Sequence, residues 1–312
     1  MVKIVTGAAG FIGSNLAQRL LENGEEVIGI DCFIDYYPRE IKEKNLSSLK
    51  DFKTFRFFNK NILDIDLEAL LDGVDGIYHQ AAQAGVRASW GKDFEIYTKN
   101  NIQATQKLLE AVKDRKVRVV YASSSSVYGE TKKLPMNEDD TPRPVSPYGV
   151  SKLAAEHLCR LYYVNFGTST VSLRYFTVYG PRQRPDMAFH RFLKAVITGN
   201  DITLYGTGEQ TRDFTFISDA VDANIQAMEK GKPGGVYNIG GGSRVSVNHV
   251  ISKIEEIVGK KARVNRIERQ KGDVTHTYAD TGRAREDLGF SPKANLENGL
   301  AAEAQWLKDN IL

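Results

Sequence analysis

The feature that most limits how this chain can fold is a glycine triplet close to its start. Gly7, Gly10 and Gly13 follow an apolar run, Val2–Thr6, and open a helical pattern over Phe11–Asn23. A strand that turns through glycines directly into a helix begins a βαβ unit, which buries its strand in a parallel sheet. The same turn leaves the N–H groups of the helix N-terminus free, and these favour an anion such as a pyrophosphate.

Short apolar runs alternate with helical patterns through the first half of the chain. We expect further strands at Val27–Asp31, Thr54–Phe58, Gly76–His79, Val117–Ser123 and Thr170–Tyr175, and helices at Phe94–Arg115 and Pro147–Phe166. Strands separated by helices pair in parallel and are covered by helices on both faces. The sequence therefore predicts an α/β fold built on a doubly wound parallel sheet of the Rossmann type.

The pattern changes after Tyr175, where prolines and glycines mark several loops. We divide the chain into a dinucleotide-binding domain, residues 1–175, and a smaller C-terminal α/β lobe for the substrate, residues 176–312. The two are expected to interleave, because sheet-like runs recur near Phe214–Ile217 and Val236–Ile239. The last helix is expected near Leu296–Leu307.

Composition argues against several classes of function. The 312 residues carry a formal net charge of +3, which is too small to indicate a nucleic-acid or membrane partner. Cys32 and Cys159 form no disulfide framework, the histidines lack metal-ligand spacing, and His79 at a strand end is expected to be structural, so we expect no metal. Without a membrane-spanning apolar stretch or a signal-peptide pattern, a cytoplasmic protein is expected.

A carboxylate stands where a dinucleotide fold needs one. Asp31 ends the second predicted strand, 18 residues beyond Gly13. At this place a carboxylate accepts a hydrogen bond from the 2′-hydroxyl of the adenosine ribose, and it would repel a 2′-phosphate. Together with the glycine turn, Asp31 predicts that the chain binds NAD rather than NADP.

A tyrosine and a lysine near the middle of the chain indicate oxidation of an alcohol. Tyr148 and Lys152 share one face of the helix that Ser146 caps and Pro147 begins. Lowering a phenol pKa from about 10 to about 7 takes about 4 kcal/mol, which one ammonium at ~4 Å supplies at an effective dielectric constant of about 20. With the positive nicotinamide nearby as well, Tyr148 is the expected general base, and Lys152 is expected to lower its pKa.

A second tyrosine and lysine at the same spacing serve as a control. Tyr128 is followed by Gly129 and by a loop that ends at Pro135. No helix is therefore expected to present Tyr128 and Lys132 on one face, and we assign this pair no catalytic role.

A run of four serines, Ser123–Ser126, follows a predicted strand. At the carboxyl end of a parallel strand, hydroxyl groups face the ligand crevice. A serine there can hydrogen-bond both a substrate hydroxyl and the negative charge that develops on it.

These motifs resemble those of the extended short-chain dehydrogenase/reductases that act on nucleotide sugars. The resemblance covers nearly the whole chain, and further matching segments are His79–Gln83, Asn100-Asn101, Arg174–Pro181, Gly208–Phe214, Tyr237–Gly240 and Gly272-Asp273. It implies that NAD is held by Gly7, Gly10, Phe11, Ile12, Gly13, Asp31, Asn61, Ile62, Gln80, Ala81, Ala82, Gln83, Asn101, Tyr148 and Lys152. It also implies a homodimer formed through two helices of each subunit, Phe94–Arg115 and Pro147–Phe166.

The resemblance implies epimerisation rather than elimination. Related dehydratases and decarboxylases carry an acidic residue just before the Val-Tyr-Gly turn, where this chain has Ser126. Elimination needs a carboxylate as acid and base. In the implied mechanism, Tyr148 takes the proton of the sugar 4-hydroxyl while C4 gives a hydride to NAD, and the 4-keto sugar turns over before the hydride returns. Ser124 matches the catalytic hydroxyl of the family, with Ser125 and Ser126 beside it.

A few residues of the C-terminal half indicate the sugar. Thr177 stands where galactose-type epimerases have asparagine, and Arg182–Ala188 resembles the corresponding segment of UDP-glucuronate 4-epimerases. A uronate carries a carboxylate at C5, for which hydroxyl and guanidinium groups are suitable donors. We expect Thr177 and Arg184 to bind it, with Arg191 a further candidate; the alternatives for Arg184 are the diphosphate or a solvated loop. By resemblance, the other substrate-binding residues are Tyr205, Gln210, Arg212 and Asp273.

The expected function is NAD-dependent 4-epimerisation of a UDP-sugar, foremost UDP-glucuronate to UDP-galacturonate. The nearest alternative is a UDP-glucose or UDP-N-acetylhexosamine 4-epimerase, because only the sugar-binding residues separate the two. A UDP-glucuronate decarboxylase would release CO2. A nonenzymatic NAD-binding scaffold is disfavoured by the intact Ser124, Tyr148 and Lys152.

Overall fold

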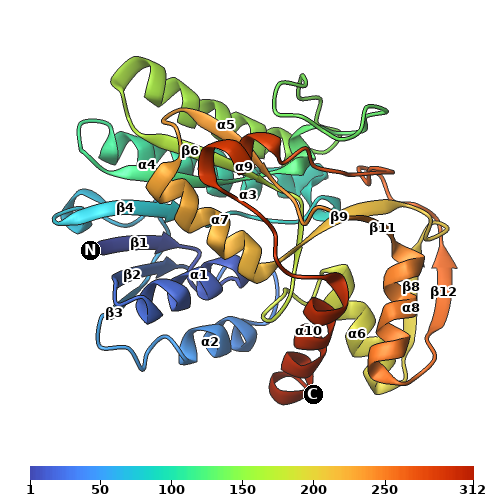
Figure 1. Ribbon diagram of the computed structural model, residues 1–312. Coiled ribbons are helices and arrows are strands. Elements are labelled where there is room, and N and C mark those ends of the chain that lie inside the picture. Colours follow the sequence, from blue (N-terminus) through green and yellow to red (C-terminus); the bar gives the residue numbers. More distant parts are fainter.

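The computed structural model describes residues 1–312, and its centre is a seven-stranded parallel sheet (Figure 1). The strand order is β10-β6-β5-β4-β1-β2-β3, so the direction of winding reverses between β1 and β4. The strands are β1 (Val2–Thr6), β2 (Glu26–Asp31), β3 (Phe55–Asn59), β4 (Val74–His79), β5 (Arg118–Ser124), β6 (Thr170–Tyr175) and β10 (Gly235–Ile239). In such sheets, ligands bind beyond the carboxyl ends of the strands at the point of reversal.

Helices cover both faces of this sheet (Figure 1). One face carries α1 (Phe11–Glu22), α7 (Ile217–Lys230) and α9 (Gly282–Leu288), and the other carries α3 (Phe94–Tyr97), α4 (Ala104–Val112) and α5 (Pro147–Phe166). Neighbouring strand residues alternate between the two cores: Val5 packs with the α1 side and Ile4 with the α4 side. Burial on both faces explains why these strands are apolar throughout. The short α2 (Arg39–Ser47) lies between β2 and β3 in the chain.

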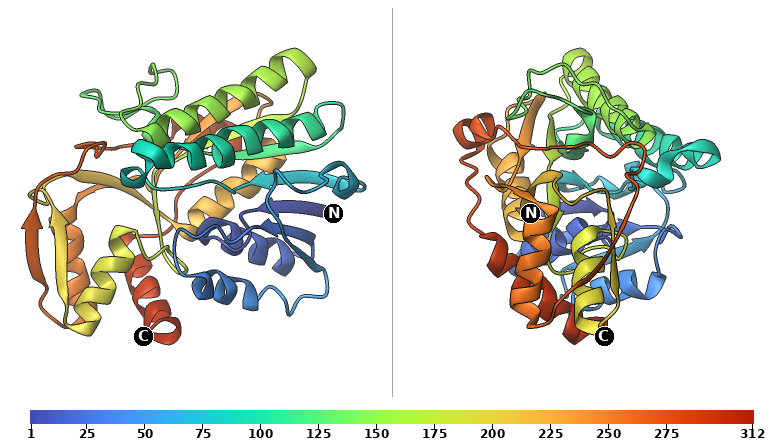
Figure 2. Two further views of the ribbon diagram at one scale, coloured as in Figure 1. Left: turned by 180° about the vertical axis from the view of Figure 1, so that it is seen from behind. Right: turned by 90° about the vertical axis from the view of Figure 1, so that its right-hand side faces the viewer.

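A smaller lobe lies beyond the carboxyl ends of the central strands, and the views from behind and from the side agree on this place (Figure 2). Its helices are α6 (Ala188–Thr198), α8 (Val247–Val258) and α10 (Leu296–Asn310). One small sheet has the order β11-β9-β7 and the other pairs β12 with β8. These strands are β7 (Thr177–Tyr179), β8 (Asp201–Tyr205), β9 (Thr211–Phe216), β11 (Arg244–Ser246) and β12 (Arg263–Ile267). The lobe has an apolar core of its own, which includes Phe189, Ile202 and Leu300.

The strands predicted for the first half are confirmed to within two residues at each end, and the helix Pro147–Phe166 is confirmed at both ends. The expectation that Phe214–Ile217 joins the central sheet is wrong. This segment ends β9, which pairs in parallel with β7 outside that sheet. The chain returns to the central sheet through α7 and β10 instead.

The continuous helix predicted over Phe94–Arg115 is also corrected. The segment is divided into α3, a π-helical stretch at Thr98–Gln103, and α4. The widened turn contains Asn101, whose side-chain amide donates to the carbonyl of Gln83 (3.1 Å) and accepts from its N–H (2.7 Å). Such bulges are frequent at functional sites because they redirect one side chain without ending the helix.

Candidate functional site

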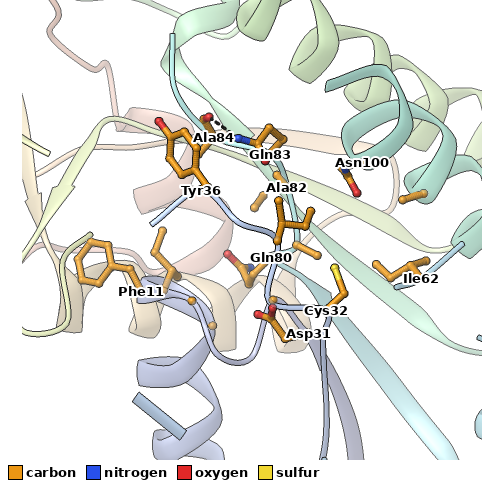
Figure 3. Close-up of a pocket in the computed structure, with 18 of the residues that line it drawn as sticks. Phe11, Asp31, Cys32, Tyr36, Ile62, Gln80, Ala82, Gln83, Ala84 and Asn100 are labelled. Atoms are coloured by element: carbon orange, nitrogen blue, oxygen red, sulfur yellow. Dashed lines mark hydrogen bonds between the residues drawn. The ribbon is translucent and has the colours of Figure 1, made fainter. Parts of the chain in front are cut away.

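A pocket lies at the carboxyl ends of β1, β2, β4 and β5, and Figure 3 shows part of its wall. Asp31 and Cys32 come from the end of β2, and Gln80, Ala82, Gln83 and Ala84 follow β4. The residues expected to hold the cofactor that do line it are Gly7, Gly10, Phe11, Ile12, Gly13, Asp31, Asn61, Ile62, Gln80, Ala81, Ala82, Gln83, Tyr148 and Lys152. The tertiary fold thus brings one candidate set together from widely separated parts of the chain.

The glycine turn is packed too closely for side chains. A Cβ on Gly13 would lie 2.1 Å from the carbonyl oxygen of Gly7, and a Cβ on Gly7 would lie 2.9 Å from the backbone nitrogen of Ala81. Gly7 also has φ +69°, which favours glycine. Gly10 is the N-cap of α1 and supplies no side-chain cap, so the N-terminus of the helix is open toward the pocket. This geometry suits a phosphate.

The Asp31 carboxylate is fixed at the end of β2. One oxygen accepts from the N–H of Ala9 (3.1 Å) and the other from that of Phe33 (2.9 Å). The Lys42 ammonium lies 3.9 Å from the carboxylate and also lines the pocket, which the sequence did not indicate. Carboxylate oxygens have capacity for further hydrogen bonds, so Asp31 can still accept from a diol.

One of the expected cofactor contacts is corrected. Asn101 is 1% exposed and does not line the pocket, whereas its neighbour Asn100 does. The side chain of Asn101 makes two hydrogen bonds to the Gln83 backbone, and a third joins it to Ser151 (2.8 Å). Asn101 therefore holds the loop after β4 against α5. The expectation for Asn101 came from the family resemblance, which did not indicate the π-helical turn that holds both asparagines.

Tyr148 and Lys152 meet in the pocket, as their helix predicts. Ser146 caps α5, since its hydroxyl accepts from the N–H of Gly149 (3.1 Å). Lys152 is 2% exposed, and its ammonium makes no hydrogen bond or ion pair within the chain. The ammonium lies 4.5 Å from the ring centroid of Tyr121. Burial lowers the pKa of Lys152 to about 7, and the nearby thiol and carboxylate on α5 oppose this only partly.

The effect of Lys152 on the pKa of Tyr148 stays a prediction for the protein with NAD bound, because other groups set the Tyr148 pKa in the protein without ligands. Burial raises the pKa of Tyr148, and the groups that oppose this are the Ser124 hydroxyl and the Arg184 guanidinium. Lys152 is not among these groups, and its own pKa is lowered to about 7 by desolvation.

The four serines have different surroundings. Ser123 lines the pocket and donates to the Glu156 carboxylate (2.6 Å). Ser124 is the serine next to Tyr148, and its oxygen accepts from the N–H of Ser126 (3.1 Å). Ser125 and Ser126 begin a short 3₁₀ turn, and neither is among the groups that act on the Tyr148 hydroxyl. The geometry thus favours Ser124 among the three serines expected to be catalytic.

Tyr128, Lys132 and His79 have the surroundings that the sequence predicts. Tyr128 ends the 3₁₀ turn and is buried, whereas Lys132 is exposed in the following loop, so the two do not share a helix face. His79 is fully buried between the hydroxyls of Thr6 (2.8 Å) and Thr105 (3.0 Å), and desolvation lowers its pKa to about 3. It is a structural histidine.

Arg184 belongs to the pocket. Its Nε and Nη2 both donate to the Asp186 carboxylate at 3.0 Å, while its Nη1 makes no hydrogen bond within the chain. The Arg184 side chain is 22% exposed and is held by Asp186, which disfavours the alternative of a solvated loop residue. Asp186 also accepts from the hydroxyl of Tyr36 (3.3 Å), another pocket residue that the sequence analysis missed.

The other expected substrate residues gather around Tyr205. The Arg191 guanidinium lies 5.9 Å from the Tyr205 ring centroid, and Gln210 donates to the Tyr205 carbonyl (2.8 Å). Arg87, which the sequence analysis missed, lies 3.9 Å from the same centroid and forms an ion pair with Asp273 (2.7 Å).

Two expected residues stand at the edges of this group. Arg212 is directed to the carbonyls of Val274 (2.7 Å) and Thr275 (3.1 Å), and burial lowers its pKa. Thr177 begins β7, directly after the end of the central sheet. Neither Arg87 nor Tyr36 belongs to a motif, so only the packing of the two lobes reveals them.

No helix is both long and apolar enough to cross a membrane.

Comparison with known proteins agrees with this geometry. The signature of the NAD dependent epimerase/dehydratase family matches residues 3–240. The chain is 48% identical over 309 residues to a Bacillus subtilis protein named as an uncharacterized UDP-glucose epimerase, covering 97% of each. It is 38% identical over 318 residues to the UDP-glucuronate 4-epimerase of Thermodesulfobacterium geofontis, covering 99% of this chain and 96% of that one. The crystal structure of the Bacillus cereus UDP-glucuronic acid 4-epimerase with UDP-glucuronic acid and NAD is similar at TM-score 0.96 and 48% identity, over 99% of both chains.

Proposed function

The chain belongs to the NAD-dependent epimerase/dehydratase family, and from this premise we propose that it is a UDP-hexuronate 4-epimerase that interconverts UDP-glucuronate and UDP-galacturonate. One observation carries the proposal: Arg184 lines the same pocket as Tyr148 and Lys152 and keeps one guanidinium nitrogen free. A cation beside the base that acts at C4 suits a sugar with a carboxylate at C5. The similarity to UDP-glucuronate 4-epimerases supports this assignment.

The residues of the pocket fit NAD. The open N-terminus of α1 offers N–H groups to the pyrophosphate, in a turn where a Cβ on Gly7 or Gly13 would clash. Asp31 would hold the adenosine ribose and disfavour a 2′-phosphate. The Lys152 ammonium, buried and without a partner in the chain, has three donors for the nicotinamide ribose. When bound, NAD accepts the hydride of C4 and returns it.

The chain's own residues carry the proton transfer. Tyr148 takes the proton of the sugar 4-hydroxyl at its phenol oxygen and gives it back when the sugar has turned over. Burial raises the pKa of Tyr148. To act as a base near neutral pH, its phenolate therefore needs stabilisation from Ser124, from Arg184 and from the positively charged nicotinamide of NAD. Ser124 also donates to the sugar oxygen on which negative charge develops.

The absence of an acid at position 126 directs the 4-keto sugar toward epimerisation. Ser126 is held in the 3₁₀ turn, and its N–H is bound to the Ser124 oxygen. No carboxylate there can remove a second proton or protonate a leaving group. The sugar therefore rotates and accepts the hydride on its other face.

The group around Tyr205 suits the nucleotide part of the substrate. Arg87, Arg191 and Arg212 supply positive charge for a diphosphate, and the Tyr205 ring supplies an apolar face for uracil. Gln210 and Asp273 fix Tyr205 and Arg87, respectively. Thr177, together with Arg184, would donate to the C5 carboxylate.

The protein is proposed to be a cytoplasmic homodimer. Large apolar side chains are exposed along α5, among them Val150, Leu161, Val164 and Phe166, and Ile96 on α3 adds to them. Val150, Leu161 and Val164 share one face of α5 by their spacing, and a monomer rarely exposes such a group. A second copy that brings the same face covers both. Light scattering should report a dimer for the wild type and a monomer for Leu161→Glu/Val164→Glu.

One assay tests the function. The purified protein is incubated with NAD and either UDP-glucuronate or UDP-glucose, and the products are followed by NMR. Formation of UDP-galacturonate is expected. Faster conversion of UDP-glucose to UDP-galactose would mean that the preferred substrate is a neutral UDP-sugar and not a UDP-uronate. Release of CO2 with a UDP-pentose would indicate a decarboxylase, and unchanged sugars would favour a nonenzymatic scaffold.

A further inference from the structure

A buried ion pair lies directly behind the residues of the reaction. Glu156 is on α5, one helical turn after Lys152 and two after Tyr148, so the three share a helix face. Its carboxylate accepts from Ser123 Oγ (2.6 Å), from Arg174 Nε (3.0 Å) and from Arg174 Nη2 (2.7 Å). Glu156 and Arg174 are each 4% exposed, so water does not compete for these bonds.

The bonds continue from Arg174 into the rest of the sheet. Its remaining nitrogen, Nη1, donates to the hydroxyl of Tyr128 (2.8 Å) and to the carbonyl of Glu138 (3.2 Å). The Tyr128 hydroxyl in turn donates to Asn238 Oδ1 (2.7 Å). Tyr128 follows β5, Arg174 lies on β6 and Asn238 on β10. The network therefore connects three strands, or the residues that follow them, to α5. It also gives a structural role to Tyr128, the tyrosine of the second Tyr-x-x-x-Lys sequence.

We propose that Glu156, Arg174 and Tyr128 form a positioning network that fixes α5 against the end of β5, so that Tyr148 meets Ser124 in the geometry that proton transfer needs. Ser123, which is bound to Glu156, precedes Ser124 directly in the chain. A shift of α5 along the sheet would stretch this bond and would also move Tyr148 relative to Ser124. The inference rests on the proposed function only in requiring that Tyr148 acts on a bound sugar.

Because Glu156 and Arg174 form a buried ion pair, a role in positioning is favoured over a role in stabilising the fold. Replacing a buried ion pair with well-packed apolar side chains is often neutral or stabilising, so such a pair is weak evidence for stability. Its hydrogen bonds are directional, however, and the three bonds to Glu156 fix both distance and angle. An apolar contact at the same place would let the helix slide. A misplacement of about 1 Å can cost about 100-fold in rate.

The test uses a remote member of the network. Tyr128 is 4% exposed and does not line the pocket, so Tyr128→Phe removes one acceptor of Arg174 while it keeps the ring. We expect kcat to fall about tenfold and KM for the UDP-sugar to change less than about twofold. Tyr237→Phe is the matched control: Tyr237 is 1% exposed on β10 and bonds to Asp287 (3.2 Å), outside the network. It should lose a similar amount of thermal stability and keep its kcat.

A second pair of variants keeps the proposal testable if Tyr128→Phe fails to fold. Ser123→Ala removes the bond to Glu156, and Ser123→Thr restores a hydroxyl. The alanine variant should lose kcat, and the threonine variant should recover most of it. If Tyr128→Phe and Ser123→Ala lower the melting temperature but keep the wild-type kcat, the network is structural only and the proposal is overturned. A wild-type protein that turns over no UDP-sugar would overturn the proposed function and this inference together.

Discussion

The choice of sugar depends on Arg184, and replacing it with alanine gives the sharpest test. In the structure, the Nε and Nη2 edge of Arg184 is taken by Asp186, which leaves Nη1 for a ligand. A hydrogen bond to a charged group contributes about 1.5–3 kcal/mol. Because 1.4 kcal/mol corresponds to a factor of ten, Arg184→Ala should lower kcat/KM for UDP-glucuronate by about 10- to 150-fold.

The same substitution should affect UDP-glucose much less. Its neutral CH2OH group forms no charge-assisted bond, so we expect a loss of less than about fivefold. The loss that remains has two causes. Arg184 lowers the pKa of Tyr148, so its removal raises that pKa further, and Asp186 is left without its partner. The double variant Arg184→Ala/Asp186→Ala removes the unpaired carboxylate and isolates the effect on the sugar.

The measurement is kcat/KM for both UDP-sugars by NMR, with the wild type, the single variant and the double variant side by side. An equal loss for both sugars would refute the assignment of Arg184 to the C5 carboxylate and would instead favour a diphosphate contact. Unchanged turnover of UDP-glucuronate would remove Arg184 from the site altogether.

Three further outcomes are expected. Tyr148→Phe should lower kcat about 10²- to 10⁴-fold with an unchanged circular dichroism spectrum, because the general base is lost; turnover within tenfold of wild type would contradict this role. Lys152 has a folded-state pKa of about 7 against 10.5 when free, so the unfolded chain binds the extra proton and wild-type stability should rise between pH 7 and pH 10. Lys152→Met should remove this rise in urea unfolding, and a parallel pH profile would argue against a desolvated lysine. Burial raises the pKa of Glu303 well above its usual range, so the folded chain keeps a proton and stability falls as pH rises toward neutrality. Glu303→Gln keeps an acceptor for the Gly180 N–H and should gain about 1 kcal/mol at pH 8 but little at pH 4, as thermal unfolding at the two pH values will measure.

The sequence alone determined those parts of the protein that depend on local pattern. The strands of the central sheet and the limits of α5 follow from apolar runs, from the Ser146 cap and from Pro147, and these act over a few residues. The position of Asp31 and the glycine turn also followed, because the first βαβ unit fixes them within about 30 residues. That Tyr128 and Lys132 do not share a helix face was predictable for the same reason, since a glycine directly follows Tyr128.

Tertiary structure decided which residues meet across the two lobes and how their charges behave. Arg87 reaches Tyr205 and Asp273 from more than 100 positions away in the sequence, and no motif marks it. Asn100 rather than the expected Asn101 lines the pocket, and the sequence did not predict the π-helical turn that holds both. The pKa values of Tyr148 and Lys152 depend on desolvation by the whole surrounding core, which spacing within one helix cannot convey. Contacts of this kind follow from the packing of the complete chain, and only the folded structure determines them.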